Sequence, residues 1–350
     1  MFKQITIVGT GLIGGSLGLA LKRAGSGGKG FKSKGFKIKI VGCDRAPVLA
    51  AARKRGAIDR GETDCGQAVR GSDLIVLATP VGAIIDFLDR LGPRLPKNVF
   101  ITDVGSTKQE IVARARRVFG PAVARRFLGG HPMAGKEHGG IAHADAELFR
   151  DGLWFLTPAQ DQDLDSGPAA DWAALLASIG ARATTIAPEA HDRLVAWTSH
   201  LPQLLATALA SSLADFAEQL AADSGDDLML ADGSSNPSDV GGRGLRDMTR
   251  LAASPYDMWR DIALTNTANI EQALAALEQK LAHIRENLRT RELEEEFRRG
   301  AETLPALREL GGTETRRGTP SKERKEETKK RKTKTTKRTA ASRPGKRKRR

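Results

Sequence analysis

The sequence predicts two folded domains, an α/β domain with a parallel sheet over residues 1–187 and an all-α domain over residues 188–310. Short apolar runs alternate with amphipathic segments in the first part, which is typical of parallel strands wrapped by helices. Long helical periodicities replace this alternation after Pro188. A tail over residues 311–350 is rich in lysine and arginine and poor in apolar residues, so we expect it to be disordered.

The chain begins with an apolar strand that runs into a glycine-rich turn. Residues 5–8 precede Gly9, Gly11 and Gly14, which have Gly-x-Gly-x-x-Gly spacing, and helical periodicity follows from Leu17. The first glycine permits a tight turn, the second lets the backbone approach a phosphate, and the third lets the helix pack on the strand. We therefore predict a Rossmann-like dinucleotide site with the phosphates at the helix N-terminus. Leu12, Ile13, Thr79 and Pro80 complete the predicted cofactor-binding residues.

The second predicted strand, residues 38–43, ends at Asp44. An acidic residue about 20 positions beyond the glycines binds the ribose hydroxyls in this fold. Here the separation from Gly14 is longer, which we attribute to a flexible basic loop inserted over residues 25–37. A carboxylate at this place repels a 2′-phosphate, so Asp44 favours NAD over NADP, although it also fits a solvated strand end. Arg45 keeps NADP as the alternative, because an arginine can hold the extra phosphate.

Further strands and helices are predicted in alternation. The strands are expected at residues 74–78, 99–103, 127–128, 153–156 and 183–186, and the helices at residues 48–55, 81–91 and 108–118. Ligands bind at the carboxyl ends of strands in such sheets. Ser106 follows one strand end and is either a site residue or a helix cap. His131 precedes Pro132 in a glycine-flanked loop after another strand end, and is either a general base or a structural histidine.

The second domain offers two further candidate sites. Residues 191–222 have a helical pattern in which Pro202 predicts a kink beside His200, a residue that fits a site or a core position equally. Asp247 and Arg250 lie three apart after a glycine-rich loop and can share a helix face. An arginine is suited to binding a carboxylate, and a surface ion pair is the alternative.

Two more helices are expected towards the end of this domain. One begins at Ser254, with Ser254 as its cap and Pro255 in its first position. Apolar residues then repeat at 4-3-4-3-4 spacing from Ile270 to Leu288, which predicts either a subunit interface or a helix contact within the domain. Residues 292–310 are expected to continue as a charged helix.

Composition narrows the class of protein. The net charge is +14, but residues 311–350 hold 18 basic and 4 acidic residues, so the remainder is neutral. Nucleic-acid binding is therefore expected only as a weak, non-specific attraction of the tail to RNA or other polyanions. No apolar run approaches the length of a membrane span, and no signal peptide is expected. Cys43 and Cys65 have neither metal nor redox spacing, which favours a reducing, cytoplasmic location and no metal site.

Seven segments together resemble one family. GTGLIGGSLGLAL, DLIVLATPV, ITDVGSTKQEIV, FLGGHPMAGKEHGG, TSHLPQLLA, GRGLRDMTRLA and SPYDMWRDIALTN occur in this order over residues 4 to about 290. In order and spacing they resemble the prephenate/arogenate dehydrogenases of tyrosine biosynthesis. The resemblance implies a nucleotide-binding domain, a helical domain that intertwines into a homodimer, and an active site between them. A fused mutase is not expected, because it would need a helical domain before the first strand. A C-terminal regulatory domain is not expected either, because the sequence after residue 290 has no alternating strand and helix patterns.

The resemblance also assigns roles to residues. His131 matches the catalytic histidine that binds the ring 4-hydroxyl, Ser106 the serine that supports it, and Arg250 the arginine that binds the substrate carboxylate. Glu137, Asp247, Trp259 and His200 match residues in or around the substrate pocket. Gln203 departs from the His-Leu-Pro-His pattern of many members and lies where the substrate side chain is expected.

We therefore predict NAD-dependent oxidative decarboxylation of prephenate. Arogenate is the nearest alternative substrate, as for an arogenate or cyclohexadienyl dehydrogenase. A neutral Gln203 favours the keto acid prephenate, because the ammonium of arogenate calls for an acidic partner. Another two-domain hydroxy-acid dehydrogenase would explain the glycine turn but not the HPMAGKE and DMTR segments together.

Overall fold

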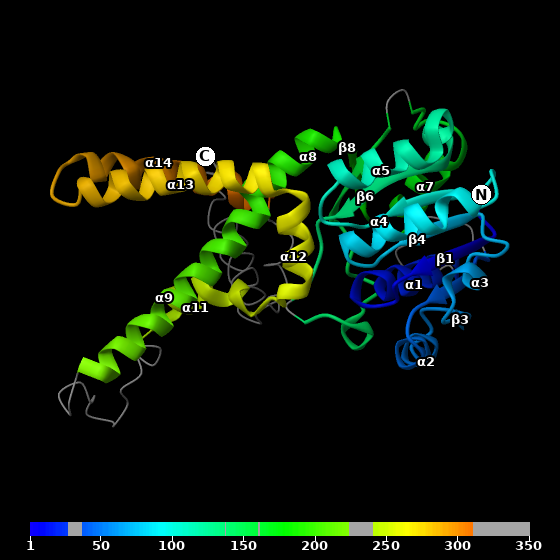
Figure 1. Ribbon diagram of the computed structural model, residues 1–350, viewed down its shortest axis with the longest axis horizontal. Helices are drawn as coiled ribbons and strands as arrows, with labels where there is room; N and C mark the ends of the chain where they lie inside the picture. Colours follow the sequence, from blue (N-terminus) through cyan, green and yellow to red (C-terminus); the bar gives the residue numbers. More distant parts are fainter. Residues whose placement is uncertain (27–36, 137, 160–161, 224–240, 311–350) are drawn as a thin grey trace, which may run out of the picture. The chain divides into compact units, whose positions relative to one another are not determined.

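The computed structural model describes residues 1–26, 37–136, 138–159, 162–223 and 241–310 (Figure 1). The chain forms two compact units, residues 1–288 and residues 289–350. Most of the predicted basic loop, Glu137 and the whole predicted tail lie outside the described residues.

The first unit contains one eight-stranded sheet in the order β3-β2-β1-β4-β5-β6-β7-β8. The strands are β1 (Gln4–Val8), β2 (Lys39–Cys43), β3 (Arg60–Glu62), β4 (Leu74–Leu77), β5 (Phe100–Asp103), β6 (Phe127–Pro132), β7 (Leu153–Thr157) and β8 (Arg182–Thr185). The predicted α/β class is confirmed, and β3 is an additional edge strand with only three residues. Strands β1, β4 and β5 lie parallel in the middle of the sheet and are almost fully buried.

The sheet departs from the predicted parallel arrangement at one place. Strand β7 runs antiparallel to β6, with His131 opposite Phe155. This pairing extends β6 to Pro132, so His131 lies within a strand and not in the predicted loop. The short apolar run Phe127–Leu128 gave no sign of this extension, because glycines follow it and the partner strand lies more than 20 residues further along the chain.

Helices cover both faces of the sheet and form two hydrophobic cores. On one face α1 (Leu12–Gly25), α2 (Ala46–Lys54) and α7 (Gly167–Ser178) pack on the sheet around the buried Trp154 and Trp172. On the other face lie α3 (Cys65–Ala68), α4 (Val81–Arg90), α5 (Gln109–Phe119) and α6 (Val123–Arg126). The helices α1, α4 and α5 all begin at the carboxyl edge of the parallel strands, where the predicted site residues gather.

The two cysteines form a disulfide. Cys43 ends β2 and Cys65 begins α3, and their sulfur atoms are bonded to each other. The expectation of two reduced thiols is therefore wrong for this structure, because a separation of 22 residues in sequence becomes a short distance once β2 and α3 pack together. The cysteine content therefore no longer supports a reducing compartment.

The remaining part of the first unit is helical. It comprises α8 (Pro188–Val195), a π-helical turn (Ala196–His200), α9 (Leu201–Asp223), α11 (Arg243–Thr249), a 3₁₀ turn (Arg250–Ala253), α12 (Tyr256–Thr265) and α13 (Thr267–Glu286). The π turn lies directly before Pro202, where the missing donor predicts a break in the α-helical pattern. Helix α12 begins one residue later than predicted, with Pro255 and not Ser254 as its N-cap.

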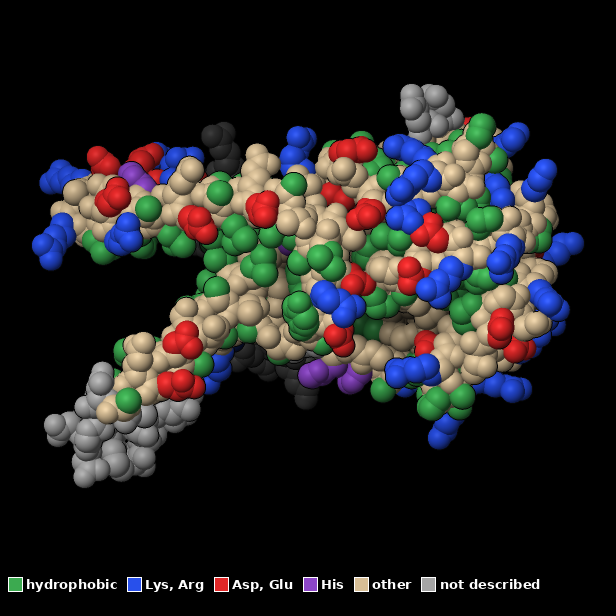
Figure 2. All heavy atoms as spheres, viewed as in Figure 1, with side chains coloured by type: hydrophobic (Ala, Val, Ile, Leu, Met, Phe, Trp, Pro, Cys, Tyr) green, Lys and Arg blue, Asp and Glu red, His purple; other side chains and the backbone are tan. Residues whose placement is uncertain are grey.

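The apolar repeat of α13 divides into a buried and an exposed part. Ile270 is buried against Ala196 and Ile262, with Leu274 and Trp259 packed beside them. Leu281 and Leu288, further along, are more than half exposed. Figure 2 shows hydrophobic side chains along α13 and around the start of α9. The repeat therefore makes an internal contact at one end and leaves an apolar surface at the other.

In the second unit the described part is α14 (Glu292–Leu310), which is separate from α13 and not continuous with it. Its exposed face carries ion pairs from Arg298 to Glu295 and Glu302. Among the described helices, none is long and apolar enough to cross a membrane.

Candidate active site

The glycine turn has the geometry of a dinucleotide cradle. Gly9 has φ +91°, and a Cβ there would lie 2.4 Å from the carbonyl oxygen of Ala78. A Cβ at Gly14 would lie 1.9 Å from the carbonyl oxygen of Gly9, so α1 can approach β1 only with glycine at this position. At Gly11 nothing lies within 4 Å, which leaves room for a ligand beside the first turn of α1. The residues present fit a dinucleotide pyrophosphate.

Asp44 lies against this turn. Its Oδ2 accepts hydrogen bonds from the backbone N–H of Thr10 at 2.7 Å and from the Thr10 hydroxyl at 3.2 Å, and its Oδ1 accepts from the Arg45 N–H at 2.7 Å. Two acceptor positions on Oδ2 are thereby used, and one remains on Oδ1. The carboxylate is held in place at the end of β2 and can still accept one ribose hydroxyl.

His131 is bonded to a second histidine. Its Nδ1 lies 2.9 Å from Nε2 of His191 in α8, and Nδ1 of His191 lies 2.8 Å from Oδ1 of Asp192. His131 is half-buried, whereas His191 and Asp192 are fully buried. The rings of the two histidines meet edge to face, and Phe155 of β7 contacts the His191 ring in the same way.

Asp192 also holds the start of α5. Its Oδ1 accepts the backbone N–H of Lys108 at 2.7 Å, and its Oδ2 accepts that of Gln109 at 2.8 Å. The alternative role of Ser106 as the cap of this helix therefore does not apply, because the cap position is Lys108 and a residue 84 positions away supplies the acceptor. Ser106 is half-buried in the loop between β5 and α5, on the edge of the sheet that carries His131.

A buried ion pair lies beneath His131. Lys108 and Asp103 are both fully buried and bonded to each other, and the Lys108 ammonium also donates to the carbonyl of Gly130 at 2.8 Å. Asp103 accepts from the backbone N–H of Gly105 at 2.8 Å and of Gly130 at 3.2 Å. The pair therefore joins the end of β5 to the residue directly before His131.

Burial keeps the histidines of this site neutral. Burial lowers the pKa of His131 well below its usual range, and His191, Lys108 and His200 lower it further. Burial also lowers the pKa of His191, with the Asp192 carboxylate opposing the shift. The pKa of His200 falls to about 4, again mainly through burial. A neutral imidazole is the form that can accept a proton.

The helical part of the first unit adds a polar cluster next to these histidines. His200 is buried, meets the Trp259 ring edge to face, and lies 3.2 Å from the amide nitrogen of Asn266. The same amide donates to the carbonyl oxygen of Asp192 at 2.8 Å. The indole nitrogen of Trp259 is buried and makes no hydrogen bond with any described residue. His200 and Trp259 are thus connected to the His191–Asp192 pair.

Gln203 is also buried, and its amide donates to the carbonyl oxygen of Leu251 at 2.7 Å. Leu251 follows Arg250, which begins the 3₁₀ turn and is exposed. The structure therefore places the predicted Gln203 and Arg250 on neighbouring segments. Asp247 is exposed on α11, and Glu137 lies outside the described residues.

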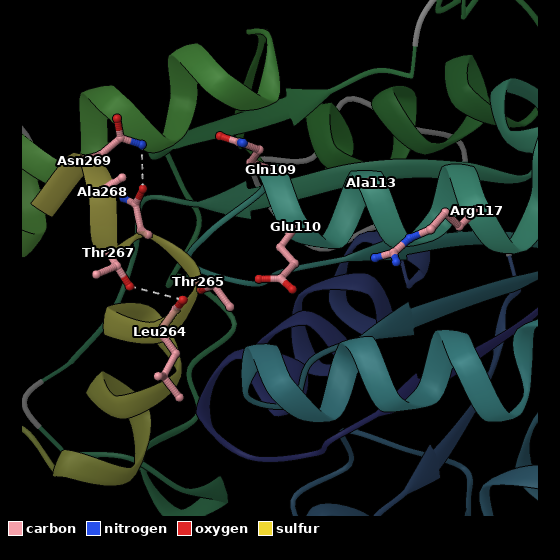
Figure 3. A pocket seen from close by; sticks show the side chains of 10 residues that line it. Gln109, Glu110, Ala113, Arg117, Leu264, Thr265, Thr267, Ala268 and Asn269 are labelled. Atoms are coloured by element: carbon pink, nitrogen blue, oxygen red, sulfur yellow. Dashed lines mark hydrogen bonds between the residues drawn. The ribbon is translucent and has the colours of Figure 1, made fainter.

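A separate cavity of about 430 Å³ lies between α5 and the junction of α12 and α13 (Figure 3). Gln109, Glu110 and Arg117 line it on one side, and Leu264 to Asn269 on the other. None of the predicted site residues lines this cavity. Within the described ranges no three metal-binding side chains cluster.

Sequence reasoning missed His191, Asp192 and Asn266. The adjacent His-Asp pair at the start of the helical domain was the available signal, since a histidine beside a carboxylate is a common arrangement in acid–base sites. Its partners lie about 60 and 84 residues away in sequence, so the contact itself could not be predicted without the fold.

The site combines a glycine cradle for a dinucleotide with a neutral histidine on the same edge of the sheet. A buried histidine–carboxylate pair lies behind that histidine. Together these features define a nicotinamide-dependent oxidoreductase with a helical second domain. Comparison with known families agrees. Residues 28–185 match the prephenate dehydrogenase nucleotide-binding domain, and residues 187–302 match the prephenate dehydrogenase dimerization domain. The chain belongs to the prephenate dehydrogenase family.

Individual relatives are similar over most of the chain. A prephenate dehydrogenase of Lactococcus lactis is 31% identical over 75% of this chain, which spans 65% of that protein's length. A cyclohexadienyl dehydrogenase of Zymomonas mobilis is 31% identical over 76% of this chain and 82% of its own. The crystal structure of prephenate dehydrogenase from A. aeolicus, in complex with hydroxyphenyl propionate and NAD+, is 29% identical, covers 88% of this chain and 98% of its own, and has a TM-score of 0.71.

Proposed function

We propose that the protein is an NAD-dependent prephenate dehydrogenase, which converts prephenate to 4-hydroxyphenylpyruvate and CO₂. The observation that carries the proposal is the place of His131. It is a neutral imidazole at the carboxyl end of β6, on the same sheet edge as the glycine turn after β1. Membership of the family supports this choice of substrate class.

In this mechanism His131 is the general base. Its neutral imidazole takes the proton of the ring hydroxyl while the hydride leaves the same carbon. A bound NAD+ supplies the nicotinamide that accepts this hydride. The bond between the ring and its carboxylate then breaks, CO₂ leaves, and the electron pair enters the ring, which becomes aromatic. The proton returns from His131 to the ring oxygen, and general-base help of this kind contributes on the order of 10²–10⁴-fold.

Other residues would hold the two ligands. The glycine turn and the first turn of α1 would bind the pyrophosphate, and Asp44 a ribose hydroxyl. Ser106 would lie beside the nicotinamide and support His131. Arg250 would bind a substrate carboxylate, which orients the substrate for hydride loss.

The substrate side chain would lie near Gln203 and Trp259. The indole nitrogen of Trp259, which has no hydrogen-bond partner in the described part of the chain, is a donor that a substrate oxygen could use. Gln203 is neutral and its amide is engaged with the carbonyl of Leu251, which favours a keto acid over the ammonium of arogenate. Arogenate is the second candidate, because a cyclohexadienyl dehydrogenase is among the relatives.

We also propose a homodimer formed through the helical domain, and a cytoplasmic location that rests on family membership and not on the cysteine content. The match to a dimerization domain supports the dimer, as do the exposed Leu281 of α13 and Leu288 just after this helix. The excess positive charge over residues 311–350 supports weak, salt-sensitive attraction to RNA. Sedimentation of the full chain, and RNA binding with and without these residues, would test the two statements.

The test of the activity uses purified protein with prephenate or arogenate, each with NAD+ or NADP+, and follows the absorbance of the reduced cofactor. We expect reduction of NAD+ with prephenate. Turnover of arogenate alone would refute the substrate, and at least tenfold better use of NADP+ would refute the cofactor.

The matched variant is His131→Asn, which removes the base but not the glycine cradle. We expect kcat to fall by roughly 10²-fold or more. Binding of NAD+, measured by calorimetry, should stay unchanged because His131 is not part of the cradle. A kcat near that of the wild type would mean that His131 has a structural role only.

A further inference from the structure

The hydrogen bonds behind His131 form an unbroken chain. His131 Nδ1 lies 2.9 Å from His191 Nε2, and His191 Nδ1 lies 2.8 Å from Asp192 Oδ1. This series of hydrogen bonds ends at the carboxylate of Asp192, which is fully buried where α8 meets the start of α5. Each ring nitrogen in this chain is either a donor or an acceptor, so the state of one ring decides the state of the next.

The direction of these hydrogen bonds, that is, which atom donates in each, follows from Asp192. Its two oxygens accept the backbone N–H groups of Lys108 and Gln109 at the start of α5, so both oxygens act as acceptors at a helix N-terminus. Nδ1 of His191 must therefore carry the hydrogen. In the neutral His191 ring Nε2 then has the free electron pair, and it can only accept a hydrogen from Nδ1 of His131.

We propose that His191 and Asp192 are positioning residues that fix His131 as its Nδ1–H tautomer, with the free electron pair on Nε2 facing the reaction. This inference rests on the proposed role of His131 as the general base. A neutral histidine that is free to change tautomer presents the wrong nitrogen part of the time. The two hydrogen bonds keep His131 in the productive tautomer, and they also fix the orientation of its ring.

Charged and polar groups surround this arrangement. Lys108 faces both histidines, and its charge is matched by Asp103, to which it is bonded. The Asn266 amide bridges His200 to the Asp192 carbonyl. When His131 takes up a proton, its Nδ1–H still donates to His191, and the Asp192 carboxylate lies at the other end to offset the new charge.

Two variants of His191 separate positioning from packing. His191→Phe keeps a ring against Phe155 but removes both nitrogens, whereas the amide oxygen of His191→Gln can stand in for Nε2 as the acceptor. We expect His191→Phe to lower kcat by about 10-fold or more, with KM for prephenate within about threefold of the wild type. His191→Gln should recover most of the loss. Equal kcat in both variants, or a kcat of His191→Phe within twofold of the wild type, would overturn the proposal.

The tautomer can be observed directly. Long-range ¹H–¹⁵N correlation spectra of the ¹⁵N-labelled full chain distinguish the two tautomers. The His131 signals are assigned as those that disappear in His131→Asn, and they should show the Nδ1–H form. Either the Nε2–H form or a tautomer mixture for His131 in the wild type would overturn the proposal. This measurement uses no substrate, so it tests the tautomer independently of the proposed activity. If the proposed activity is wrong, turnover is absent but the spectrum still shows the Nδ1–H form.

Discussion

Asp192 offers a sharp test of how the helical segment holds α5, through the change Asp192→Asn. The carboxylate satisfies three donors, which are the backbone N–H groups of Lys108 and Gln109 and Nδ1 of His191. An asparagine has one acceptor oxygen, and its NH₂ group must face at least one of these donors. Asp261 provides the matched control, because its carboxylate accepts one backbone N–H, that of Gly82 in the first turn of α4, at 2.9 Å. Its other donor is the half-exposed guanidinium of Arg260 at 3.3 Å, an ion pair that contributes little to stability.

The expected magnitudes follow from this difference in donors. Both changes remove a negative charge from a helix N-terminus, which costs about 0.3–1 kcal/mol. Asp261→Asn can keep its one backbone bond through the amide oxygen, so about 1 kcal/mol is the expected loss. Asp192→Asn leaves at least one buried donor without a partner, which adds about 1–3 kcal/mol. The expected loss for Asp192→Asn is therefore about 1.3–4 kcal/mol.

Urea denaturation at pH 7, followed by far-ultraviolet circular dichroism, measures both free energies of unfolding under the same conditions. The midpoint of Asp192→Asn should lie clearly below that of Asp261→Asn, with similar slopes. Equal losses in the two variants, or a loss below about 1 kcal/mol for Asp192→Asn, would refute the reasoning from unpaired donors.

Three further predictions concern binding and pH. Arg250→Gln should mainly raise KM for prephenate, because a carboxylate anchor acts on the bound substrate and the transition state alike; unchanged steady-state KM would remove Arg250 from the site. Because the pKa of His131 lies below its ordinary value of 6.5, the acid limb of kcat/KM in a pH–rate profile should lie below pH 6.5, and a limb above it would contradict the burial argument. The pKa of His200 falls from 6.5 to about 4, so between these values the unfolded chain binds a proton that the folded chain does not. Stability is therefore complete above pH 6.5 and is lost as the pH falls, by about 2 kcal/mol from pH 7 to pH 5 for this group. Urea denaturation at the two pH values should show a smaller loss for His200→Gln, and an equal loss would exclude His200 as the cause.

Much of the fold could be predicted because its signals are local. The apolar runs of β1, β4 and β5 and the glycine spacing after β1 depend on neighbours within a few residues. The antiparallel β7 could not be predicted in this way, because direction is set by pairing with β6 across a long connection. The disulfide between Cys43 and Cys65 has the same origin, since only the packing of α3 beside β2 brings the sulfurs together.

In the candidate site too, residues with a local sequence signal could be predicted, and residues defined by long-range contacts could not. Residue types and strand ends pointed to Asp44, Ser106 and His131, which lie at the carboxyl edge of the sheet. The roles of His191 and Asp192 depend on contacts with β6 and α5, and no periodicity within α8 indicates them. Gln203 shows the reverse case, since its position was predicted but its hydrogen bond to Leu251 comes from the packing of α9 on the 3₁₀ turn.

The bonds that anchor the helical segment to the nucleotide-binding segment bear on how ligands enter and leave. Asp192 holds the start of α5, Asp261 holds the start of α4, and the hydroxyls of Thr107 and Thr265 meet at 2.7 Å. A hinge opening of the two segments would break these contacts together and expose two helix ends, and it would cost one buried and two part-buried hydrogen bonds at once. Local movement of an exposed segment such as α11 would break fewer of these contacts than a hinge opening of the two segments.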